Sequence, residues 1–259
     1  MKYRIYTLGC KVNEYESEVM ASILDNHGYT KGDIPDVVII NTCTVTNNAD
    51  SKSRKLIRSV RRKYPNAILL VAGCMVQNKK ESLDIDADII IGNQNKTEII
   101  NYINDFKREK LFDVKDISKA EFENMSLSNF DLTRAYIKIQ DGCDNYCSFC
   151  IIPYVRGHVR CKRKEDVLNE AKALVNSGHK EIVLTGIHTG NYHDGNYSFA
   201  SLLQDLVNID GLRRLRISSV EITELNDAVL DVLKNNSILV DHMHIPLQSG
   251  SDEILKLMN

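Results

Sequence analysis

The stretch Asp141-Gly142-Cys143-Asp144-Asn145-Tyr146-Cys147-Ser148-Phe149-Cys150 decides how the second half of this 259-residue chain is interpreted, because it spaces three thiols as CxxxCxxC. It directly follows Ala135–Gln140, an apolar run that predicts a strand. A loop in this position lies at the carboxyl end of a parallel strand, where α/β proteins place their functional groups. The three thiols are therefore predicted to serve chemistry.

Two kinds of metal site are compatible with these thiols. Thiolates hold [4Fe–4S] clusters, and a cluster held by only three of them leaves one iron open to a substrate or cofactor. A structural zinc site would need a fourth ligand nearby, and His158 and Cys161 are the candidates. We predict an iron–sulfur cluster on Cys143, Cys147 and Cys150, and a structural zinc is the alternative.

Strands and helices alternate on the carboxyl side of this region, which predicts βα units around a parallel sheet. The expected strands are Ala135–Gln140, Ile182–Thr185, Leu215–Ser219 and Met243–Leu247, and the expected helices are Glu165–Ser177, Phe199–Val207, Asn226–Lys234 and Asp252–Met258. Four units cannot close an eight-stranded barrel. We therefore expect a partial TIM-like (β/α) barrel that is apparently truncated.

The amino-terminal part alternates in the same way, and it predicts a small doubly wound α/β domain with a parallel sheet. Its expected strands are Tyr3–Leu8, Val37–Ile40, Ile68–Ala72 and Ile89–Ile91, with helices over Glu16–Asn26, Asp50–Tyr64 and Thr97–Phe106. The charged stretch 107–133 lacks a sustained period and predicts a linker. The expected domains are thus residues 1–106 and 134–259.

Cys10, Cys43 and Cys74 each follow one of the first three expected strands by a few residues. Parallel strands bring their carboxyl ends to one edge of a sheet, so the three thiols are expected to meet there. The alternative is that they are three small buried core residues.

The bulk composition limits the class of protein. No apolar run approaches the roughly 20 residues that cross a bilayer, and no charged-then-apolar leader begins the chain, so we expect a cytoplasmic protein without a membrane partner. Seven cysteines in such a protein indicate ligands or catalytic thiols rather than disulfides. The net charge of −2 provides no global basic field, so a nucleic acid would be held by local patches.

The loop with CxxxCxxC and an aromatic residue before its third cysteine resembles the signature of the radical-SAM superfamily. Together with the three cysteines of the first domain, the chain is similar to the radical-SAM methylthiotransferase family. Further matching runs are Cys150–Gly157 and His244–Ser251. The resemblance covers essentially the whole chain.

The resemblance implies two [4Fe–4S] clusters, and the second is held by Cys10, Cys43 and Cys74. It also implies S-adenosyl-L-methionine (SAM) as cofactor, a tRNA substrate, an electron donor such as flavodoxin or ferredoxin, and a monomer. One SAM would methylate a sulfur held at the second cluster. A second SAM would yield the radical that takes a hydrogen from carbon 2 of the adenine.

The runs Thr7–Ser17 and Asn41–Thr46 look most like the MtaB-type subgroup, which modifies N6-threonylcarbamoyladenosine next to the tRNA anticodon. The alternatives within the family are isopentenyladenosine in tRNA and an aspartate of a ribosomal protein. From another class, the alternative is an iron–sulfur electron-transfer module that has no SAM pocket.

Three residues that follow expected strands of the second domain are expected to meet the cofactor or substrate. For Gly186 the resemblance to radical-SAM enzymes implies this, because many of them have a glycine-rich turn at this place, although this chain has Thr185-Gly186-Ile187-His188. Gly186 follows the second strand, Glu221 the third and Gln248 the fourth. The alternative for Glu221 and Gln248 is that they are rim residues, and Gly186 is expected to contact the cofactor through its backbone. No catalytic residue beyond the cluster ligands is predicted.

Basic residues near the sites can be interpreted as functional or as solvated charges. Arg156 and Arg160, beside the cysteine loop, either neutralise an anionic cluster, meet phosphate, or are solvated surface charges. The expected helix around Arg54, Arg58 and Arg61 carries a basic stripe that would suit either solvent or a tRNA backbone.

Overall fold

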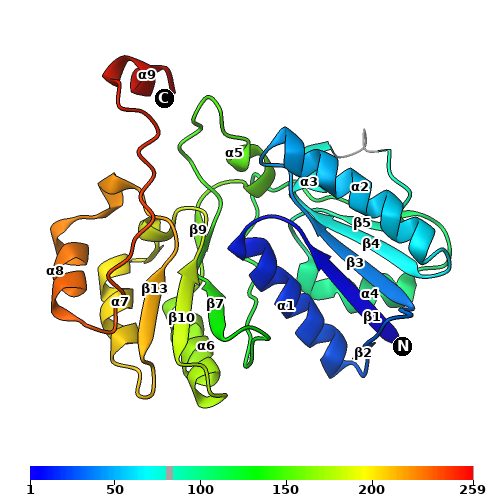
Figure 1. Cartoon of the computed structure of the whole chain (residues 1–259), viewed down its shortest axis with the longest axis horizontal. Helices are drawn as coiled ribbons and strands as arrows, with labels where there is room; N and C mark the ends of the chain where they lie inside the picture. Colours follow the sequence, from blue (N-terminus) through cyan, green and yellow to red (C-terminus); the bar gives the residue numbers. More distant parts are fainter. Residues whose placement is uncertain (80–83, 259) are drawn as a thin grey trace. The chain divides into compact units, whose positions relative to one another are not determined.

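The computed structural model describes residues 1–79 and 84–258 (Figure 1). The chain divides into two compact units. The first comprises Met1–Met125 together with Tyr154–Gly157, and the second comprises Ser126–Pro153 together with His158–Asn259. No helix within the described ranges is both long enough and apolar enough to cross a membrane.

The first unit is built on a six-stranded sheet in the order β2-β1-β3-β4-β5-β6, and its neighbouring strands run parallel. The strands are β1 (Lys2–Thr7), β2 (Thr30–Lys31), β3 (Val37–Thr42), β4 (Ile68–Gly73), β5 (Ile89–Ile91) and β6 (Leu111–Asp113). The central strands are buried on both faces, as parallel sheets usually are. A near-continuous apolar run such as Val37–Ile40 is the consequence.

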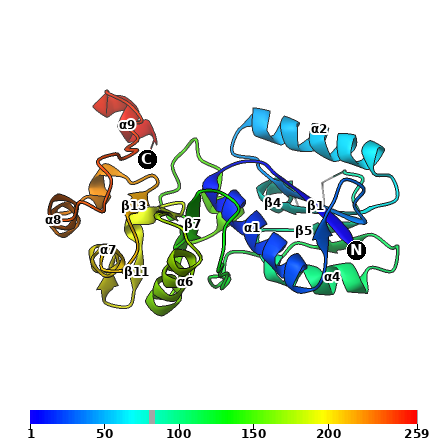
Figure 2. The same cartoon turned by 60° about the horizontal axis from the view of Figure 1, so that its bottom comes forward.

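Helices cover both faces of this sheet, as Figure 2 shows. Helices α1 (Lys11–Asn26) and α4 (Ile99–Asp105) pack with Leu24, Ile39 and Leu70 on one face. Helices α2 (Asn47–Lys63) and α3 (Cys74–Lys79) pack with Ile40 and Val71 on the other. Alternate residues of one strand thus enter different cores, because side chains of a strand point to opposite faces. This confirms the predicted doubly wound parallel-sheet domain.

The strand order reverses between β1 and β3. The chain goes from β1 through α1 to β2 on one side, and then returns past β1 to β3 on the other. In open α/β sheets the crevice at the carboxyl ends of the strands flanking such a reversal is the usual binding position. This edge carries the loops that begin at Leu8 and Cys43.

The second unit contains a three-stranded parallel sheet in the order β13-β10-β7. Its strands are β7 (Arg134–Lys138), β10 (Glu181–Thr185) and β13 (Arg214–Ile217), and its main helices are α6 (Lys164–Asn176), α7 (Phe199–Val207), α8 (Asp227–Asn235) and α9 (Asp252–Met258). The alternation of these strands and helices confirms the partial (β/α) barrel. Short elements in its loops are the pairs β8 (Gln140–Asp141) with β9 (Arg160–Cys161) and β11 (His193–Asp194) with β12 (Tyr197–Ser198). Helix α5 (Ile152–Arg156) begins in this unit, and its residues from Tyr154 on belong to the first unit.

The structure differs from the sequence-based expectation in several places. Helix α1 begins at Lys11, five residues before the expected start, because its first turn buries Val12, Asn13 and Tyr15. Part of the expected linker is ordered, since β6 pairs with β5 and Ile117 is buried. The periodicity of charged residues does not reveal a strand that is three residues long.

The expected strand Met243–Leu247 is wrong. Its one bridge pairs Ser219 with His244, and Pro246 has no backbone N–H to donate to a ladder. Ile245 and Leu247 are exposed. An apolar run forms a strand only where a neighbouring strand pairs with it along its length.

Gly73, the last residue of β4, tests how tightly the cysteine edge is built. Its φ is +103°, and a Cβ there would lie 2.6 Å from the carbonyl oxygen of Thr42. We expect Gly73→Ala to destabilise the first unit by roughly 2–5 kcal/mol through backbone strain and this clash. Denaturant unfolding followed by circular dichroism measures the change.

Gly178→Ala is the matched control. Gly178 has a φ of +110° but would place its Cβ in open space, so we expect a cost of only about 1–2 kcal/mol from strain. Equal losses for the two variants would show that the contact with Thr42 does not matter.

Candidate functional site

Three cysteines follow three neighbouring strands of the first unit. Cys10 is the N-cap residue of α1 after β1, Cys43 directly follows β3, and Cys74 directly follows β4 as the first residue of α3. Because β1, β3 and β4 are adjacent and parallel, their carboxyl ends lie at the same edge of the sheet. Cys10 is exposed, whereas Cys43 and Cys74 are buried.

The three thiols interact electrostatically. Burial raises the pKa of the Cys43 thiol, and the neighbouring Cys74 and Cys10 thiols raise it further. Gly9 permits the close approach of the first two loops, because a Cβ at Gly9 would lie 3.0 Å from the Cys43 sulfur. Three mutually repelling thiolates would be stabilised by a cation held between them, so the donor set fits a metal centre.

The second set of cysteines lies on the loop after β7 and β8. Cys143 is buried, and Cys147 and Cys150 are half-buried. Burial raises the pKa of Cys147, with smaller contributions from Cys150, Cys143 and Glu221. Tyr146 adopts a positive φ of 47°, which turns the backbone sharply between the first two cysteines.

Asp141 ties the start of this loop to two cations. Its carboxylate accepts from Lys138 at 2.8 Å and from Arg160 at 3.3 Å, and it also accepts from the backbone N–H of Gly142 at 2.9 Å. All three side chains are nearly inaccessible to solvent. Arg160 is therefore a buried structural cation, and its reading as a solvated surface charge is wrong.

Gln140 is a buried residue that joins the cysteine loop to the turn after β10. Its Oε1 accepts from the backbone N–H groups of Ile187 and His188 at 2.9 and 2.7 Å. Its Nε2 donates to the carbonyls of Asp141 and Gly142 at 3.0 and 2.7 Å. A Cβ at Gly186 would lie 2.9 Å from the Gln140 Oε1 atom, so the glycine makes this junction possible.

His188 lies between the cysteine loop and Glu224. Its Nδ1 is 2.7 Å from the Glu224 Oε1 atom, and its Nε2 is 3.3 Å from the Asn145 side chain. Hydrogen bonds with Cys143 and Glu224 raise the pKa of His188 to about 10, against the opposing effect of burial. Sequence reasoning missed both His188 and Glu224. The available signal was that His188 lies three residues after the end of an expected strand, Ile182–Thr185.

The three predicted cofactor residues are placed differently by the structure. Gly186 follows β10 and Glu221 follows β13, so both lie at the edge that carries the cysteine loop. The charge of Glu221 acts on Cys147, and its backbone N–H donates to Glu224 at 2.9 Å. Gln248 is exposed on the irregular segment before α9 and has a φ of 58°. Cofactor binding by all three stays a prediction.

The candidate fourth ligands for zinc have other partners. His158 pairs with Asp144. The Cys161 sulfur lies 3.9 Å from His193 Nδ1 and from the carbonyl oxygen of Asn191. The partner of His158 thus belongs to the cysteine loop, directly after Cys143, whereas the contacts of Cys161 are with Asn191 and His193 outside that loop.

The basic stripe of α2 contains both ion-paired and exposed cations. Arg54 pairs with Asp50 within the helix, and Arg61 pairs with Asp86 and Asp88. The residues left exposed are Lys52, Lys55, Arg58, Arg62 and Lys63. RNA binding by this remaining basic face stays a prediction.

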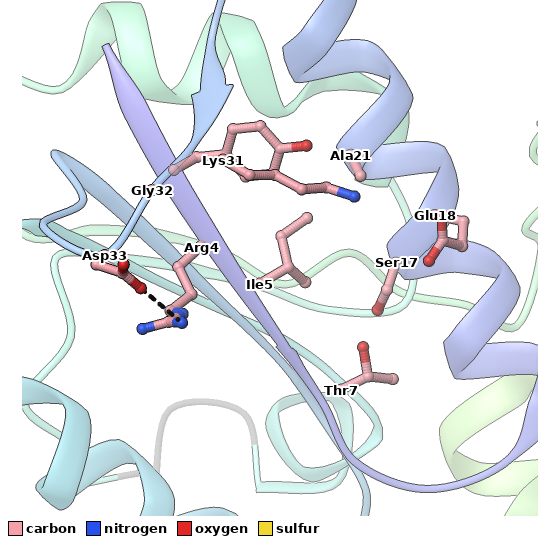
Figure 3. Close-up of a pocket in the computed structure, with 10 residues that line it drawn as sticks. Arg4, Ile5, Thr7, Ser17, Glu18, Ala21, Lys31, Gly32 and Asp33 are labelled. Atoms are coloured by element: carbon pink, nitrogen blue, oxygen red, sulfur yellow. Dashed lines mark hydrogen bonds and ion pairs between the residues drawn. The ribbon is translucent and has the colours of Figure 1, made fainter. Parts of the chain in front are cut away.

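A cavity of about 450 Å³ lies between β1, β2 and α1, and Figure 3 shows the side chains around it. Strand β2 pairs only with Lys2 and Tyr3 of β1, so Arg4, Ile5 and Thr7 border the cavity on that side of the strand. Arg4 pairs with Asp33 at its rim (Figure 3). The predicted cysteine ligands do not line this cavity.

In residues 1–79 and 84–258, no three His, Cys, Asp or Glu side chains are already gathered into a metal-binding geometry. The thiols of each set nevertheless act on one another electrostatically, and none of them forms a disulfide. The residues therefore fit a thiolate-bound metal cluster, whose ligation stays a prediction.

Comparison with known families divides the chain at the same place as the cysteine sets. Residues 2–92 match the Uncharacterized protein family UPF0004, and residues 137–259 match the Radical SAM superfamily. Each match contains one of the two predicted sets of cysteine ligands.

Curated relatives resemble nearly the entire chain. The chain is 43% identical over 98% of its length to "Threonylcarbamoyladenosine tRNA methylthiotransferase MtaB" of Bacillus subtilis, and 38% identical to the protein of the same name from Thermotoga maritima. It is 35% identical to "tRNA-2-methylthio-N(6)-dimethylallyladenosine synthase" of Clostridium botulinum. The chain spans 59–61% of the length of these three relatives.

A solved structure shares the fold. The radical S-adenosylmethionine methyltransferase TsrM from Kitasatospora setae aligns with a TM-score of 0.65 and 14% identity. The alignment covers 98% of this chain and 60% of that one. At this identity the likeness shows the fold alone.

His188 provides a pH-dependent test of the site. Because its pKa is raised above the unfolded value of 6.5 to about 10, its charge stabilises the fold fully below pH 6.5, and this stabilisation is lost as the pH rises through about 10. We expect His188→Gln to cost roughly 1–3 kcal/mol at pH 6 in the cluster-free chain.

Urea unfolding of the parent chain and of His188→Gln between pH 6 and 10 measures this difference. It should shrink with rising pH, whereas the exposed His242→Gln should cost little at any pH. A cost for His188→Gln that stays constant up to pH 10 would contradict the raised pKa.

Proposed function

We propose that this member of the radical-SAM methylthiotransferase family forms the cluster-binding part of an enzyme that methylthiolates carbon 2 of an adenosine in tRNA. The single observation that carries the proposal is the arrangement of two separate three-cysteine sets. The first set follows three strands of a parallel sheet at its carboxyl edge, and the second lies on the one loop after β7 and β8. Each set lies within one of the two family matches.

Six cysteines would hold two [4Fe–4S] clusters. Cys143, Cys147 and Cys150 would leave one iron open for SAM, and Cys10, Cys43 and Cys74 would hold the cluster from which sulfur is supplied. When bound, the clusters and SAM supply electron transfer, the organic radical and the sulfur. An external reduced flavodoxin or ferredoxin would provide the electrons.

The chain's own residues would orient and shield these groups. Gln140 couples the cysteine loop to the turn at Gly186 through four hydrogen bonds. His188 places a hydrogen-bonding imidazole beside Cys143, and Glu224 orients this ring. Glu221 lies near enough for its charge to act on Cys147, which supports the proposal that it meets the cofactor. Gln248 is proposed to meet the cofactor or the base.

N6-threonylcarbamoyladenosine next to the anticodon is the proposed substrate. The 43% and 38% identical relatives are named for that nucleoside, whereas the relative named for dimethylallyladenosine is 35% identical. The exposed cations of α2, such as Arg58 and Arg62, would suit a phosphate backbone. The proposed setting of the enzyme is the cytoplasm, where it would act as a monomer.

Cleavage of SAM separates this proposal from an electron-transfer module. The full-length protein is reconstituted anaerobically with iron and sulfide, reduced with dithionite, and assayed for 5′-deoxyadenosine. We expect formation of this nucleoside, and we expect Cys147→Ala to reduce it to background because one of the three ligands is lost. Cys161→Ala is the matched control and should retain most of the activity. A loaded parent enzyme that produces no 5′-deoxyadenosine would refute the proposal.

Analysis of tRNA nucleosides by mass spectrometry tests the substrate and the division of roles. A strain that lacks the protein should lose the 2-methylthio form of N6-threonylcarbamoyladenosine and keep the 2-methylthio forms of isopentenyladenosine. Complementation with Cys43→Ala should not restore the product, although the purified variant should still cleave SAM. Loss of the isopentenyl product instead would reassign the substrate, and restoration by Cys43→Ala would contradict the second cluster.

A further inference from the structure

A hydrogen-bonded network of five polar side chains lies inside the first unit. Its members are Asn13 and Glu16 on α1, Asn93 and Lys96 after β5, and Arg156, and each of them is at most 1% exposed. Burial of an ion costs several kcal/mol unless the ion is paired and hydrogen-bonded. Buried charges of this kind therefore need hydrogen-bond and ion-pair partners, and these partners show which parts of the fold the network connects.

Glu16 is the acceptor that two cations share. Arg156 donates through Nη1 to the Glu16 Oε1 atom at 2.6 Å, and through Nη2 to the Asn13 Oδ1 atom at 2.5 Å. Lys96 donates to the Glu16 Oε2 atom and to the Asn93 Oδ1 atom. Burial lowers the pKa of Lys96, whereas a guanidinium keeps its charge at any physiological pH. Arg156 is therefore the lasting positive charge of the network.

The same network contacts all three cysteine loops of the first unit. The Asn13 Nδ2 atom donates to the carbonyl of Leu8, two residues before Cys10, at 2.7 Å, and to the carbonyl of Thr42, directly before Cys43, at 3.0 Å. The Asn93 Nδ2 atom donates to the Cys74 sulfur at 3.4 Å.

The segment that carries Arg156 is held at the same place. Asn93 also donates to the carbonyl of Val155 at 2.7 Å. One asparagine therefore links the Cys74 thiol to the backbone next to Arg156. Tyr154–Gly157 belongs to the first unit, although Arg156 follows Cys150 of the other cysteine set by only six residues in sequence.

We propose that Arg156 is a positioning residue for the Cys10, Cys43 and Cys74 site, which it serves through Asn13, Glu16 and Asn93. It holds the three loops in place and keeps a positive charge near the anionic group bound there. The proposal rests on the two-cluster function proposed above. Its electrostatic consequence is directional, because nearby positive charge favours the reduced, more negative form of an iron–sulfur cluster.

The test uses the chain with Cys143→Ala, Cys147→Ala and Cys150→Ala, so that only one three-cysteine site remains. After anaerobic reconstitution, iron is counted and the reduction potential is measured by titration with electron paramagnetic resonance detection. We expect Arg156→Met to lower the potential, Glu16→Gln to raise it, and Arg156→Lys to stay near the parent. Arg160→Met, which removes a buried arginine of the second unit, is the matched control and should leave the potential unchanged.

Opposite shifts of the reduction potential in Arg156→Met and Glu16→Gln would show that Arg156 acts through its charge. A general loosening of the fold would instead move both potentials in the same direction. Shifts of the same sign, or no shift, would overturn the proposal. Glu16→Gln is nearly isosteric, so it carries the test by itself if Arg156→Met does not fold.

A cluster-free measurement keeps this inference separate from the proposed function. If the parent takes up no iron, the two-cluster function fails, and labelling of Cys74 decides the inference. Cys74 is 2% exposed, so a thiol reagent reaches it only after local opening. We expect Arg156→Met to accelerate this labelling about tenfold or more, as followed by peptide mass spectrometry. Arg156→Lys should restore slow labelling, and equal rates in Arg156→Met and the parent would overturn the proposal.

Discussion

The register of parallel strands is the constraint on which both candidate sites depend. In-register pairing of β1 with β3 and of β3 with β4 brings three carboxyl ends to one edge. The pairing of β7, β10 and β13 does the same in the second unit. A residue placed just after any of these strands lies at its unit's edge, even when its nearest neighbour in space is distant in sequence.

The two units bring their cysteines together in different ways. In the first unit, each cysteine comes from a different strand, so the geometry depends on the whole sheet and on a backbone that tolerates close approach at Gly9 and Gly73. In the second unit, one loop supplies all three cysteines, and Gln140 and Asp141 fasten this loop to its neighbours. The first site is therefore sensitive to packing, and the second to the conformation of one loop.

Both sites contain buried charged side chains, and each of these side chains is ion-paired. Asp141 is shared by Lys138 and Arg160 in one unit, and Glu16 is shared by Lys96 and Arg156 in the other. In both cases a single carboxylate serves two cations, and removal of one partner would leave another charge buried and uncompensated. These groups constrain the loops that carry the cysteines more specifically than apolar contacts would, because hydrogen bonds are directional.

The sequence by itself determined the alternation of strands and helices, the two cysteine sets and the order of the sites along the chain, because periodicity and spacing are local properties. It did not reveal β6 or the irregular course of Met243–Leu247, since pairing depends on a neighbouring strand. Only the tertiary structure placed Gln140 against His188, His188 against Glu224 and Arg156 against Glu16, which lie 48, 36 and 140 residues apart. Such partners depend on which distant segments the fold brings together. For this reason the sequence leaves open whether Arg156 is a solvated surface charge, whereas the folded chain buries it beside Glu16.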